Sequence, residues 1–365
     1  MSTGLATDFV EPRTDGFHSL RVAAVDHLCD DAVAVTFDVP DDLRGAYAFR
    51  PGQFLTLRRH TDNGEERRSY SICAPLGAAP RVGVRRVTSG LFSEWLVDRL
   101  EAGDEVDVGP PSGSFTPDLE PGTHHGLIAA GSGITPVLSI AASLLAAHNN
   151  TRVTLLYGNR RTDTVMFTEE LADLKNTYTA RLHLVHVLSR EPTAQITSGR
   201  LDVDKLGELL TLLVAAEGVD SWWLCGPLGM TEDAVAVLAG LGIGKKQVHR
   251  ELFYVDEPPP EVHRPDDSDA VEGESSEVTV VLNGRSTNLT LPRTVSVLDA
   301  AQRVRGDMPF ACRGGVCGTC RAMLTDGDVT MRRNFALEGD EVEAGFVLTC
   351  QTLPVSEKVT VDFDV

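Results

Sequence analysis

An apolar stretch, "LIAAGSGITPVLSIAASLLAA", Leu127–Ala147, determines the architecture predicted for this chain. Its length is about that of a membrane span, which needs roughly 20 apolar residues. Gly131, Gly133 and Pro136 interrupt it where a short strand would turn into a helix, and proline suits the first turn of a helix. We therefore interpret the stretch as a buried strand followed by a helix, and not as a membrane span. The preceding His124 and His125 are expected in a solvated turn.

The same alternation of strand and helix continues after this stretch. The segments that follow are "RVTLLYGN" with "TVMFTEELADLKN", "RLHLVHVLS", and "SWWLCGP" with "MTEDAVAVLAGLG". Strands that alternate with helices predict an open parallel sheet with right-handed crossovers. We assign residues 119–255 to this α/β nucleotide-binding domain and expect Trp222 and Trp223 in its core.

The regions on either side have other patterns. Residues 17–118, after a polar tail over 1–16, run in short alternating segments broken by Gly and Pro, which predicts a small antiparallel β-barrel. Residues 256–276 are acidic and rich in proline, as in an extended linker. Residues 277–365 begin with a β-hairpin across Asn283-Gly284 and contain a short helix, a cysteine-rich loop and a closing strand, so we predict a β-grasp-like α+β domain. The fold class is therefore multidomain.

Four cysteines in the last domain form a metal-binding pattern. Cys312, Cys317 and Cys320 are spaced C-x4-C-x2-C, and Cys350 follows after 29 further residues. This is the plant-type 2Fe-2S spacing. A structural zinc site is the alternative, but it more often shows two separate C-x2-C pairs. We predict that these four thiolates bind a 2Fe-2S cluster.

The composition excludes some functions. The 365 residues have a formal net charge of -20. Nucleic-acid binding needs an excess of Lys and Arg, so no nucleic acid is expected as a partner. The polar and acidic opening "MSTGLATDFVEPRTDG" does not have the pattern of a secretory leader, so we expect a cytoplasmic protein without a membrane partner.

Short motifs in the first two regions suggest cofactor sites. In "RRSYS", Arg67–Ser71, a cation beside hydroxyl groups suits a pyrophosphate, and Tyr70 suits a flat heterocycle. In "TSGLFSEWL", Gly90 and Ser93 mark the start of a helix whose N–H groups would face phosphate. "GSGITP", Gly131–Pro136, follows an apolar strand, although such glycine pairs alone are weak signals.

Taken in order, and together with "CGP" and "RELFY" later in the chain, these motifs resemble the ferredoxin-NADP reductase family, and with the cysteine domain they resemble its three-domain oxygenase reductases. The resemblance implies an FAD site that comprises Arg68, Ser69, Tyr70, Ser71, Val84, Val87, Gly90, Leu91, Phe92, Ser93, Glu251 and Phe253. It implies a nucleotide site that comprises Gly131, Gly133, Thr135, Cys225, Gly226 and Pro227, with Thr135 and Cys225 as catalytic residues.

The segment after the strand "RLHLVHVL" bears on the choice of coenzyme. NADP-dependent members of the family place a serine and an arginine there for the 2'-phosphate, which matches Ser189 and Arg190, and a planar, permanently charged group suits that phosphate. Arg160 and Arg161 would add charge from the preceding strand end. Nearby acids, which suit the ribose hydroxyl of NADH, keep NADH as the alternative. NADPH is the predicted coenzyme.

The resemblance implies an enzyme that passes electrons from NADPH through FAD and the 2Fe-2S cluster to a multicomponent oxygenase. Within the family, the cysteine segment is most similar to the reductases of phenylacetyl-CoA epoxidases, which act in phenylacetate degradation. Reductases of ketosteroid 9α-hydroxylases and of other Rieske or di-iron oxygenases are the alternative. A passive electron carrier that does not oxidise a nucleotide is the alternative from another class.

Overall fold

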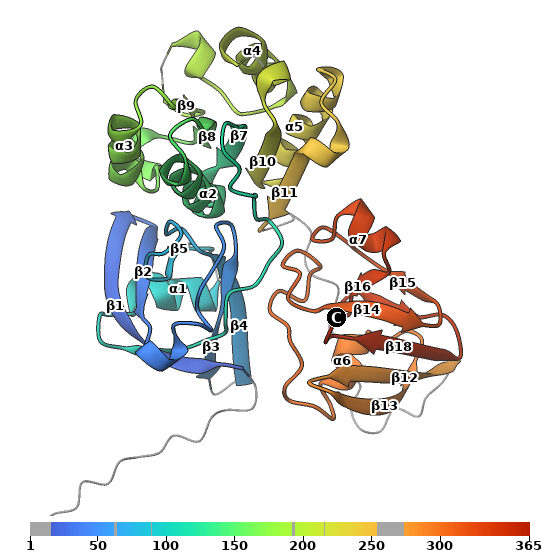
Figure 1. Ribbon diagram of the computed structural model, residues 1–365. Helices are drawn as coiled ribbons and strands as arrows, with labels where there is room; N and C mark the ends of the chain where they lie inside the picture. The colour runs from blue at the N-terminus through green and yellow to red at the C-terminus, as the bar shows by residue number, and fades with distance from the viewer. Residues whose placement is uncertain (1–15, 62–63, 89, 192–193, 215, 254–273) are drawn as a thin grey trace, which may run out of the picture.

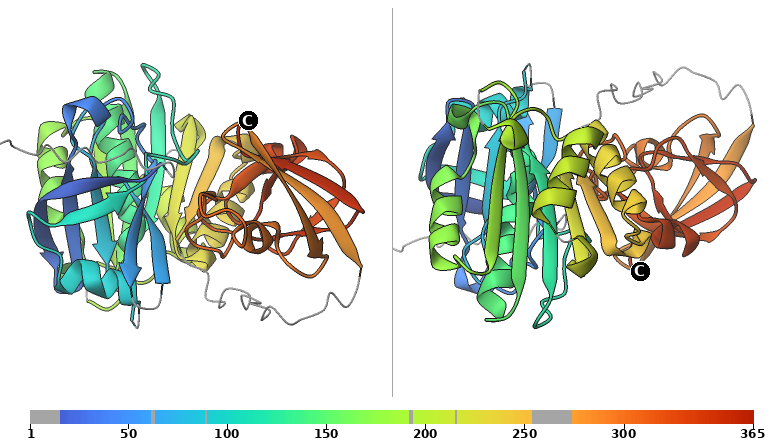
Figure 2. Two further views of the ribbon diagram at one scale, coloured as in Figure 1. Left: turned by 90° about the horizontal axis from the view of Figure 1, so that it is seen from below. Right: turned by 90° about the horizontal axis from the view of Figure 1, so that it is seen from above.

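The computed structural model describes residues 16–365 except 62–63, 89, 192–193, 215 and 254–273. These residues form three bodies, each built on its own sheet (Figure 1). Views from below and above show the C-terminal body lying to one side of the other two (Figure 2). Our linker over 256–276 lies largely outside the described residues.

The first body, called the barrel here, is a six-stranded antiparallel sheet in the order β4-β3-β6-β1-β2-β5. Its elements are β1 His18–Cys29, β2 Ala32–Asp38, β3 Phe54–Thr61, β4 Gly64–Ser71, β5 Arg81–Arg85, α1 Leu91–Asp98 and β6 Glu105–Val108. Inward side chains of the strands and of α1 share one apolar core. The alternating segments of the sequence thus form the predicted antiparallel sheet.

The second body, the nucleotide domain, is a five-stranded parallel sheet in the order β11-β10-β7-β8-β9. Its elements are β7 His124–Ala130, α2 Ile134–Ala147, β8 Arg152–Asn159, α3 Thr168–Thr177, β9 Leu182–Leu188, α4 Val203–Leu213, β10 Ser221–Gly226, α5 Leu228–Gly240 and β11 Val248–Leu252. The sequence pattern did not reveal α4 or the strand character of β11.

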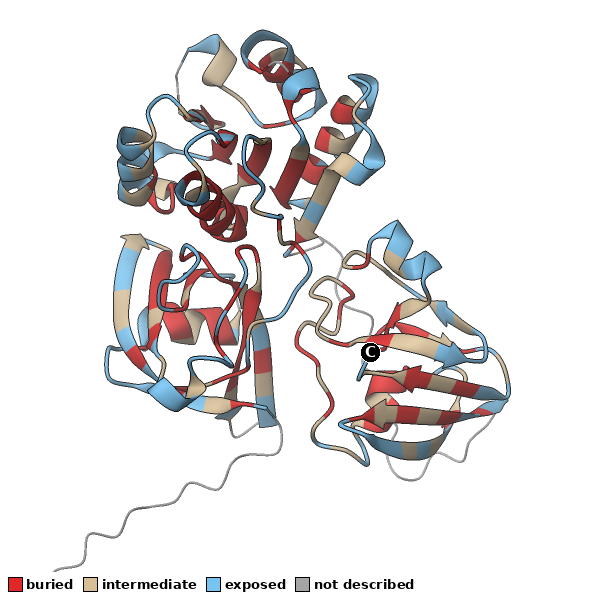
Figure 3. Cartoon of the chain, in the orientation of Figure 1, coloured by how far each residue is buried: buried red, intermediate tan, exposed pale blue. Residues whose placement is uncertain are grey.

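The two faces of this sheet belong to different cores. Leu127 and Ala129 pack with α2, α3 and residues of the barrel, whereas Ile128 packs with α4 and α5. The burial colours show the resulting continuous core of the sheet and α2 (Figure 3). Because the chain passes from β9 back across β7 to β10, the strand order reverses between β7 and β10, which is where α/β sheets bind ligands.

The third body, the C-terminal domain, has a mixed sheet in the order β13-β12-β18-β14-β16 and a two-stranded sheet of β15 and β17. Its elements are β12 Ser275–Leu282, β13 Arg285–Pro292, α6 Val297–Ala301, β14 Arg321–Asp326, β15 Val329–Met331, α7 Gly339–Glu343, β16 Phe346–Leu348, β17 Thr352–Pro354 and β18 Lys358–Asp362. Asn283 and Gly284 have φ of 54° and 67°, so both adopt the left-handed conformation of a tight hairpin turn.

Two details differ from the sequence analysis. β12 begins at Ser275, two residues before the predicted domain start, because Ser276 is buried and its hydroxyl donates to the Ser356 carbonyl at 2.6 Å. His124 and His125 do not form a solvated turn but begin β7, where His125 is buried and burial lowers its pKa to about 4. Local polarity concealed both of these strand starts.

Among the residues that the structure describes, no helix has the length and apolar character needed to cross a membrane. The apolar stretch is instead divided between β7 and α2, with Gly131–Gly133 forming a 3-10 turn between them. Trp222 and Trp223 are both buried, as expected for core residues.

The close packing of Trp222 gives a test of the nucleotide-domain core. A Cβ atom at Gly126 would lie 2.3 Å from the Trp222 ring, so Gly126→Ala should lower the free energy of unfolding by about 1–3 kcal/mol. Gly207→Ala on α4 meets no atom within 4 Å and should stabilise that helix by about 0.5–1 kcal/mol. Calorimetric unfolding of both variants measures the difference, and an unchanged midpoint for Gly126→Ala would contradict the packing.

Candidate functional site

Strand β4 presents different side chains on its two faces. Arg68 and Tyr70 point to one face of the strand, and Arg67, Ser69 and Ser71 point to the other. On the first face, the Tyr70 ring lies 6.1 Å from that of Phe92 on α1. Burial raises the pKa of the Tyr70 hydroxyl above its usual range, so this side chain stays neutral. The motif therefore presents an exposed cation and a half-buried ring side by side.

A second cation at this face was not found from the sequence. Arg59 on β3 pairs with Glu66 at 2.7 Å, and its guanidinium lies 5.2 Å from the Trp95 ring centre and 3.4 Å from the Leu91 carbonyl. It is thereby held at the first turn of α1. The position of Arg59 in the strand pair could have revealed it. Arg59 lies directly opposite Glu66, two residues along β3 from Leu57, which lies opposite Arg68.

The turn before α1 uses the Ser93 hydroxyl internally. This hydroxyl accepts the Val87 N–H at 3.0 Å and donates to the Gly90 carbonyl at 2.9 Å, which fixes Gly90 as the residue before the helix. Val84 and Phe92 are buried in the barrel core, so their side chains are committed to packing. Val87 and Leu91 are exposed.

The glycine turn after β7 fits against the end of β10. A Cβ atom at Gly133 would lie 2.1 Å from the Cys225 carbonyl oxygen, so only glycine permits this approach. Gly131 has φ of 56°. The Thr135 hydroxyl donates to the Ser132 carbonyl at 3.0 Å, and its methyl group packs against Gly83 of the barrel. These contacts bring the predicted nucleotide residues to the edge of the barrel.

Three residues far apart in sequence meet where the barrel and the nucleotide domain join. The Ser71 hydroxyl donates to Glu251 Oε2 at 3.0 Å, and Glu251 pairs in register with Cys225 on β10. Burial raises the pKa of Glu251 to about 8, and burial together with the nearby Glu251 raises the pKa of Cys225. Phe253, two residues further, is partly exposed at 37%.

The predicted coenzyme residues come together on two adjacent loops. The Arg190 N–H donates to the Arg160 carbonyl at 2.8 Å, and the Ser189 N–H donates to the Asn159 carbonyl at 3.0 Å. Arg160, Arg161 and Arg190 are exposed, and Arg161 pairs with Asp163 at 3.1 Å. The structure thus gathers arginines at the carboxyl ends of β8 and β9.

The four predicted cluster ligands occur as two pairs. Hydrogen bonding to Cys317 lowers the pKa of Cys312, and hydrogen bonding to Cys350 raises that of Cys320, so each pair is in contact. Among the described residues, no three His, Cys, Asp or Glu side chains converge as ligands of one ion. Two pairs suit a binuclear cluster, in which each iron takes two thiolates, better than a single zinc ion.

Polar groups surround these thiols. The Gly314 N–H donates to Cys312 Sγ at 3.3 Å, the Gln351 side chain donates to Cys350 Sγ at 3.7 Å, and Thr319 Oγ1 lies 3.1 Å from Cys317 Sγ. All seven cysteines of the chain are free thiols. This second layer of donors suits charged sulfur ligands.

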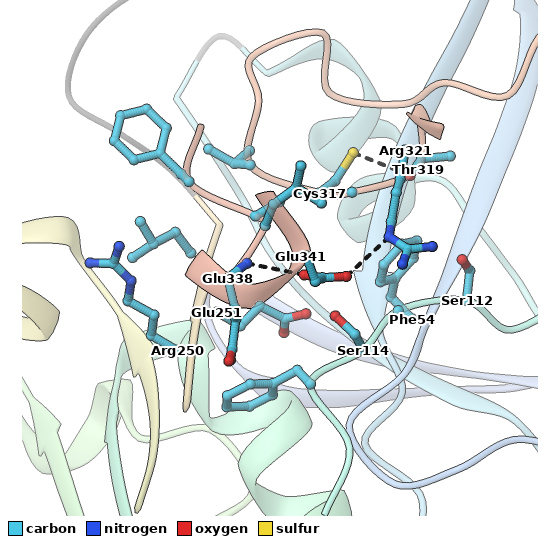
Figure 4. A pocket seen from close by; sticks show the side chains of 18 residues that line it. Phe54, Ser112, Ser114, Arg250, Glu251, Cys317, Thr319, Arg321, Glu338 and Glu341 are labelled. Atoms are coloured by element: carbon cyan, nitrogen blue, oxygen red, sulfur yellow. Dashed lines mark hydrogen bonds and ion pairs between the residues drawn. The ribbon is translucent and has the colours of Figure 1, made fainter. Parts of the chain in front are cut away.

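A cavity of about 350 Å³ lies where the three bodies meet (Figure 4). Its walls come from the barrel, from β11 and from the cysteine loop, and include Ser114, Glu251, Cys317, Arg321 and Glu338. Arg321 pairs with Glu341 at 3.0 Å on its rim, and Glu338 approaches His249 of β11 at 3.3 Å. The half-buried Glu251 and a predicted cluster ligand therefore border the same space.

Three family models match the chain, one for each body. Residues 19–116 match the oxidoreductase FAD-binding domain, residues 127–236 the oxidoreductase NAD-binding domain, and residues 280–355 the 2Fe-2S iron-sulfur cluster binding domain.

Two relatives match this chain along almost their whole length. A component of the 1,2-phenylacetyl-CoA epoxidase of Escherichia coli (strain K12) is 42% identical over 95% of this chain and 98% of that protein. The ferredoxin reductase component of the 3-ketosteroid-9-alpha-monooxygenase of Rhodococcus rhodochrous is 35% identical over 94% of this chain and 96% of that protein.

Solved structures agree with the fold. Phthalate dioxygenase reductase is 24% identical, with a TM-score of 0.60 over 97% of this chain and 100% of that chain. The FAD/NAD-binding domain of a Vibrio cholerae nitric oxide dioxygenase is 26% identical, with a TM-score of 0.57 over 66% of this chain and 99% of that chain. With its FAD-binding, NAD-binding and 2Fe-2S domains, the chain belongs to the ferredoxin-NADP reductase family, as an oxygenase reductase with a C-terminal 2Fe-2S domain.

Proposed function

We propose that this chain is the reductase component of a phenylacetyl-CoA epoxidase and passes electrons from NADPH through FAD and the 2Fe-2S cluster to the oxygenase. The observation that supports this most is the position of β4. One strand bears the flavin motif, contacts Glu251 of the nucleotide domain through Ser71, and contacts the cysteine loop through Ser69. These two contacts support a flavin on this strand that exchanges electrons with both the nucleotide domain and the C-terminal domain.

The residues around β4 fit FAD. Arg68 and Arg59 would hold the pyrophosphate, Tyr70 would lie against the ring system, and the first turn of α1 would face phosphate. A nicotinamide gives up two electrons together as a hydride, whereas a 2Fe-2S cluster accepts one electron at a time. When bound, FAD would supply the chemistry that links the two, because it can accept a hydride and release single electrons. The two thiol pairs Cys312 with Cys317 and Cys320 with Cys350 fit the cluster.

The chain's own contribution to hydride transfer is a site whose titratable side chains are neutral. Glu251 and Cys225 are both protonated at neutral pH because burial raises their pKa values. Thr135 and Gly133 hold the glycine turn against β10, so the nicotinamide would enter beside Cys225, Gly226 and Pro227. Neutral groups at this position avoid repelling the negative charge that a hydride brings.

The partner is inferred from the relatives. The relative at 42% identity is a component of a phenylacetyl-CoA epoxidase, and those at 35% belong to a ketosteroid monooxygenase. Because the phenylacetyl-CoA epoxidase relative is the more similar of the two, we infer that this chain's partner is the oxygenase of a phenylacetyl-CoA epoxidase. We place the protein in the cytoplasm, where reduced thiols persist.

Reconstitution tests this function. The holoprotein mixed with the oxygenase components of a phenylacetyl-CoA epoxidase, NADPH and oxygen should convert phenylacetyl-CoA. Cys317→Ser should lose the cluster's paramagnetic signal and this support, yet keep its FAD and still reduce ferricyanide, because the cysteine loop belongs to a separate core. Support of a ketosteroid hydroxylase instead, or oxygenase support by Cys317→Ser, would contradict the proposal.

The raised pKa of Glu251 predicts a pH dependence. Ferricyanide reduction by NADPH should fall as the pH rises through about 8, because the carboxylate then formed places a negative charge at the hydride site. Glu251→Gln should abolish this fall, whereas Glu338→Gln on the same cavity should retain it. A pH profile that is identical in wild type and Glu251→Gln would assign the titration to another group.

The arginine loops predict the coenzyme preference. Arg190→Ala should lower kcat/KM for NADPH by about tenfold or more, because a charge-assisted contact to phosphate is lost, and should change kcat/KM for NADH little. Arg152→Ala, at the opposite end of β8, is the matched control. A wild-type preference for NADH, or an equal loss with both coenzymes, would refute the assignment.

A further inference from the structure

The flavin motif contains a second arginine that the proposed FAD site does not use. Arg67 precedes Arg68 on β4 and points to the opposite face of the strand, toward the C-terminal domain. Only 3% of its side chain is exposed. A guanidinium so thoroughly removed from water needs partners for its donors, so its contacts reveal what it does.

Those partners lie in two different bodies. Within the barrel, Arg67 Nε donates to Glu65 at 2.6 Å, and the guanidinium lies 4.9 Å from the Phe17 ring centre. From the C-terminal domain, the Met308 carbonyl accepts a hydrogen bond from Nη1 at 3.1 Å, and the Phe310 ring lies 4.4 Å from the guanidinium carbon.

The contact with Phe310 continues to the cysteine loop. Arg313, which directly follows Cys312, lies over the same ring at 4.5 Å, so Phe310 has an arginine from each body against it. Two residues along β4, Ser69 Oγ lies 3.4 Å from Thr319 Oγ1, which in turn lies 3.1 Å from Cys317 Sγ. The face of β4 that bears Arg67 therefore contacts both ends of the loop.

We propose that Arg67 is the positioning residue that docks the 2Fe-2S domain onto the flavin barrel for electron transfer between them. This inference rests on the proposed assignment of the cluster to the four cysteines. Arg67 acts through Met308 and Phe310 and not through the cofactor itself.

The chemistry of the contact suits reversible docking. The barrel and the nucleotide domain share one apolar core, whereas the apolar core of the C-terminal domain consists of its own residues alone. The contacts to β4 are polar or cation-π, and an arginine, a serine and a threonine regain water when the surfaces separate. The interface thus resembles that of a transient complex. When it separates, the cysteine loop would become accessible to the oxygenase.

The test uses the full-length holoprotein with FAD and cluster, mixed anaerobically with NADPH in a stopped-flow instrument. For Arg67→Ala we expect flavin bleaching within about twofold of wild type and cluster reduction slower by about tenfold or more, since a buried charge-assisted contact and a cation-π contact are lost. Small-angle scattering should show a larger radius of gyration. Arg67→Lys, which keeps the charge but not the planar group, should be intermediate.

Two further variants separate docking from barrel stability. Phe310→Leu removes the ring contact from the other side and should also slow cluster reduction. The double variant should be slower than either single one by less than the product of their effects, because both lose the Arg67–Phe310 contact while Arg67→Ala also loses the Met308 hydrogen bond. Arg50→Ala removes an exposed arginine whose partner Asp118 is at 3.2 Å, and should behave as wild type.

Unchanged cluster reduction and scattering in Arg67→Ala would overturn the inference. So would additive effects of Arg67→Ala and Phe310→Leu, or loss of FAD from Arg67→Ala with Phe310→Leu unaffected, because these would place its role inside the barrel. A wild-type protein without a cluster signal would instead refute the proposed function, and the scattering comparison would still decide the docking.

Discussion

The period-two alternation of strand β4 is the constraint on which the rest of the arrangement depends. A strand sends successive side chains to opposite faces, so the five residues Arg67–Ser71 can serve two environments at once. Arg68 and Tyr70 face the side predicted to bind the flavin. Arg67 and Ser69 reach the C-terminal domain, and Ser71 reaches Glu251 of the nucleotide domain. A shift of register by one residue would exchange these roles and disconnect all three bodies.

The two joints made at this strand differ in kind. The barrel meets the nucleotide domain through an apolar core in which Ala32, Ala34 and Cys73 pack with residues of α2 and α3. Hydride transfer requires close and constant geometry, which such packing provides. The C-terminal domain meets the same barrel through hydrogen bonds and a stacked guanidinium. A domain that must meet its own flavin and an external partner in turn needs this weaker kind of contact.

Much of the fold could be predicted because its signals are local. Strand and helix periodicity gave the parallel sheet, and the C-x4-C-x2-C spacing gave the cysteine loop. Local polarity misled us at Ser275–Ser276 and at His124–His125, where tertiary burial places polar side chains in strands. Ser71 bonds to Glu251, which lies 180 positions away, and Arg67 bonds to Met308, which lies 241 positions away. No local sequence pattern encodes contacts over such separations. The roles of Arg68, Thr135 and Cys225 came from family resemblance and stay predictions.

The central claim is that electrons pass from flavin to cluster within one chain, across the face of β4. The most direct test measures the rate of cluster reduction after anaerobic mixing with NADPH, over a wide range of protein concentration. Transfer within the chain predicts a first-order rate that does not depend on protein concentration and follows flavin bleaching. A rate that rises in proportion to protein concentration would show transfer between molecules and would contradict the account.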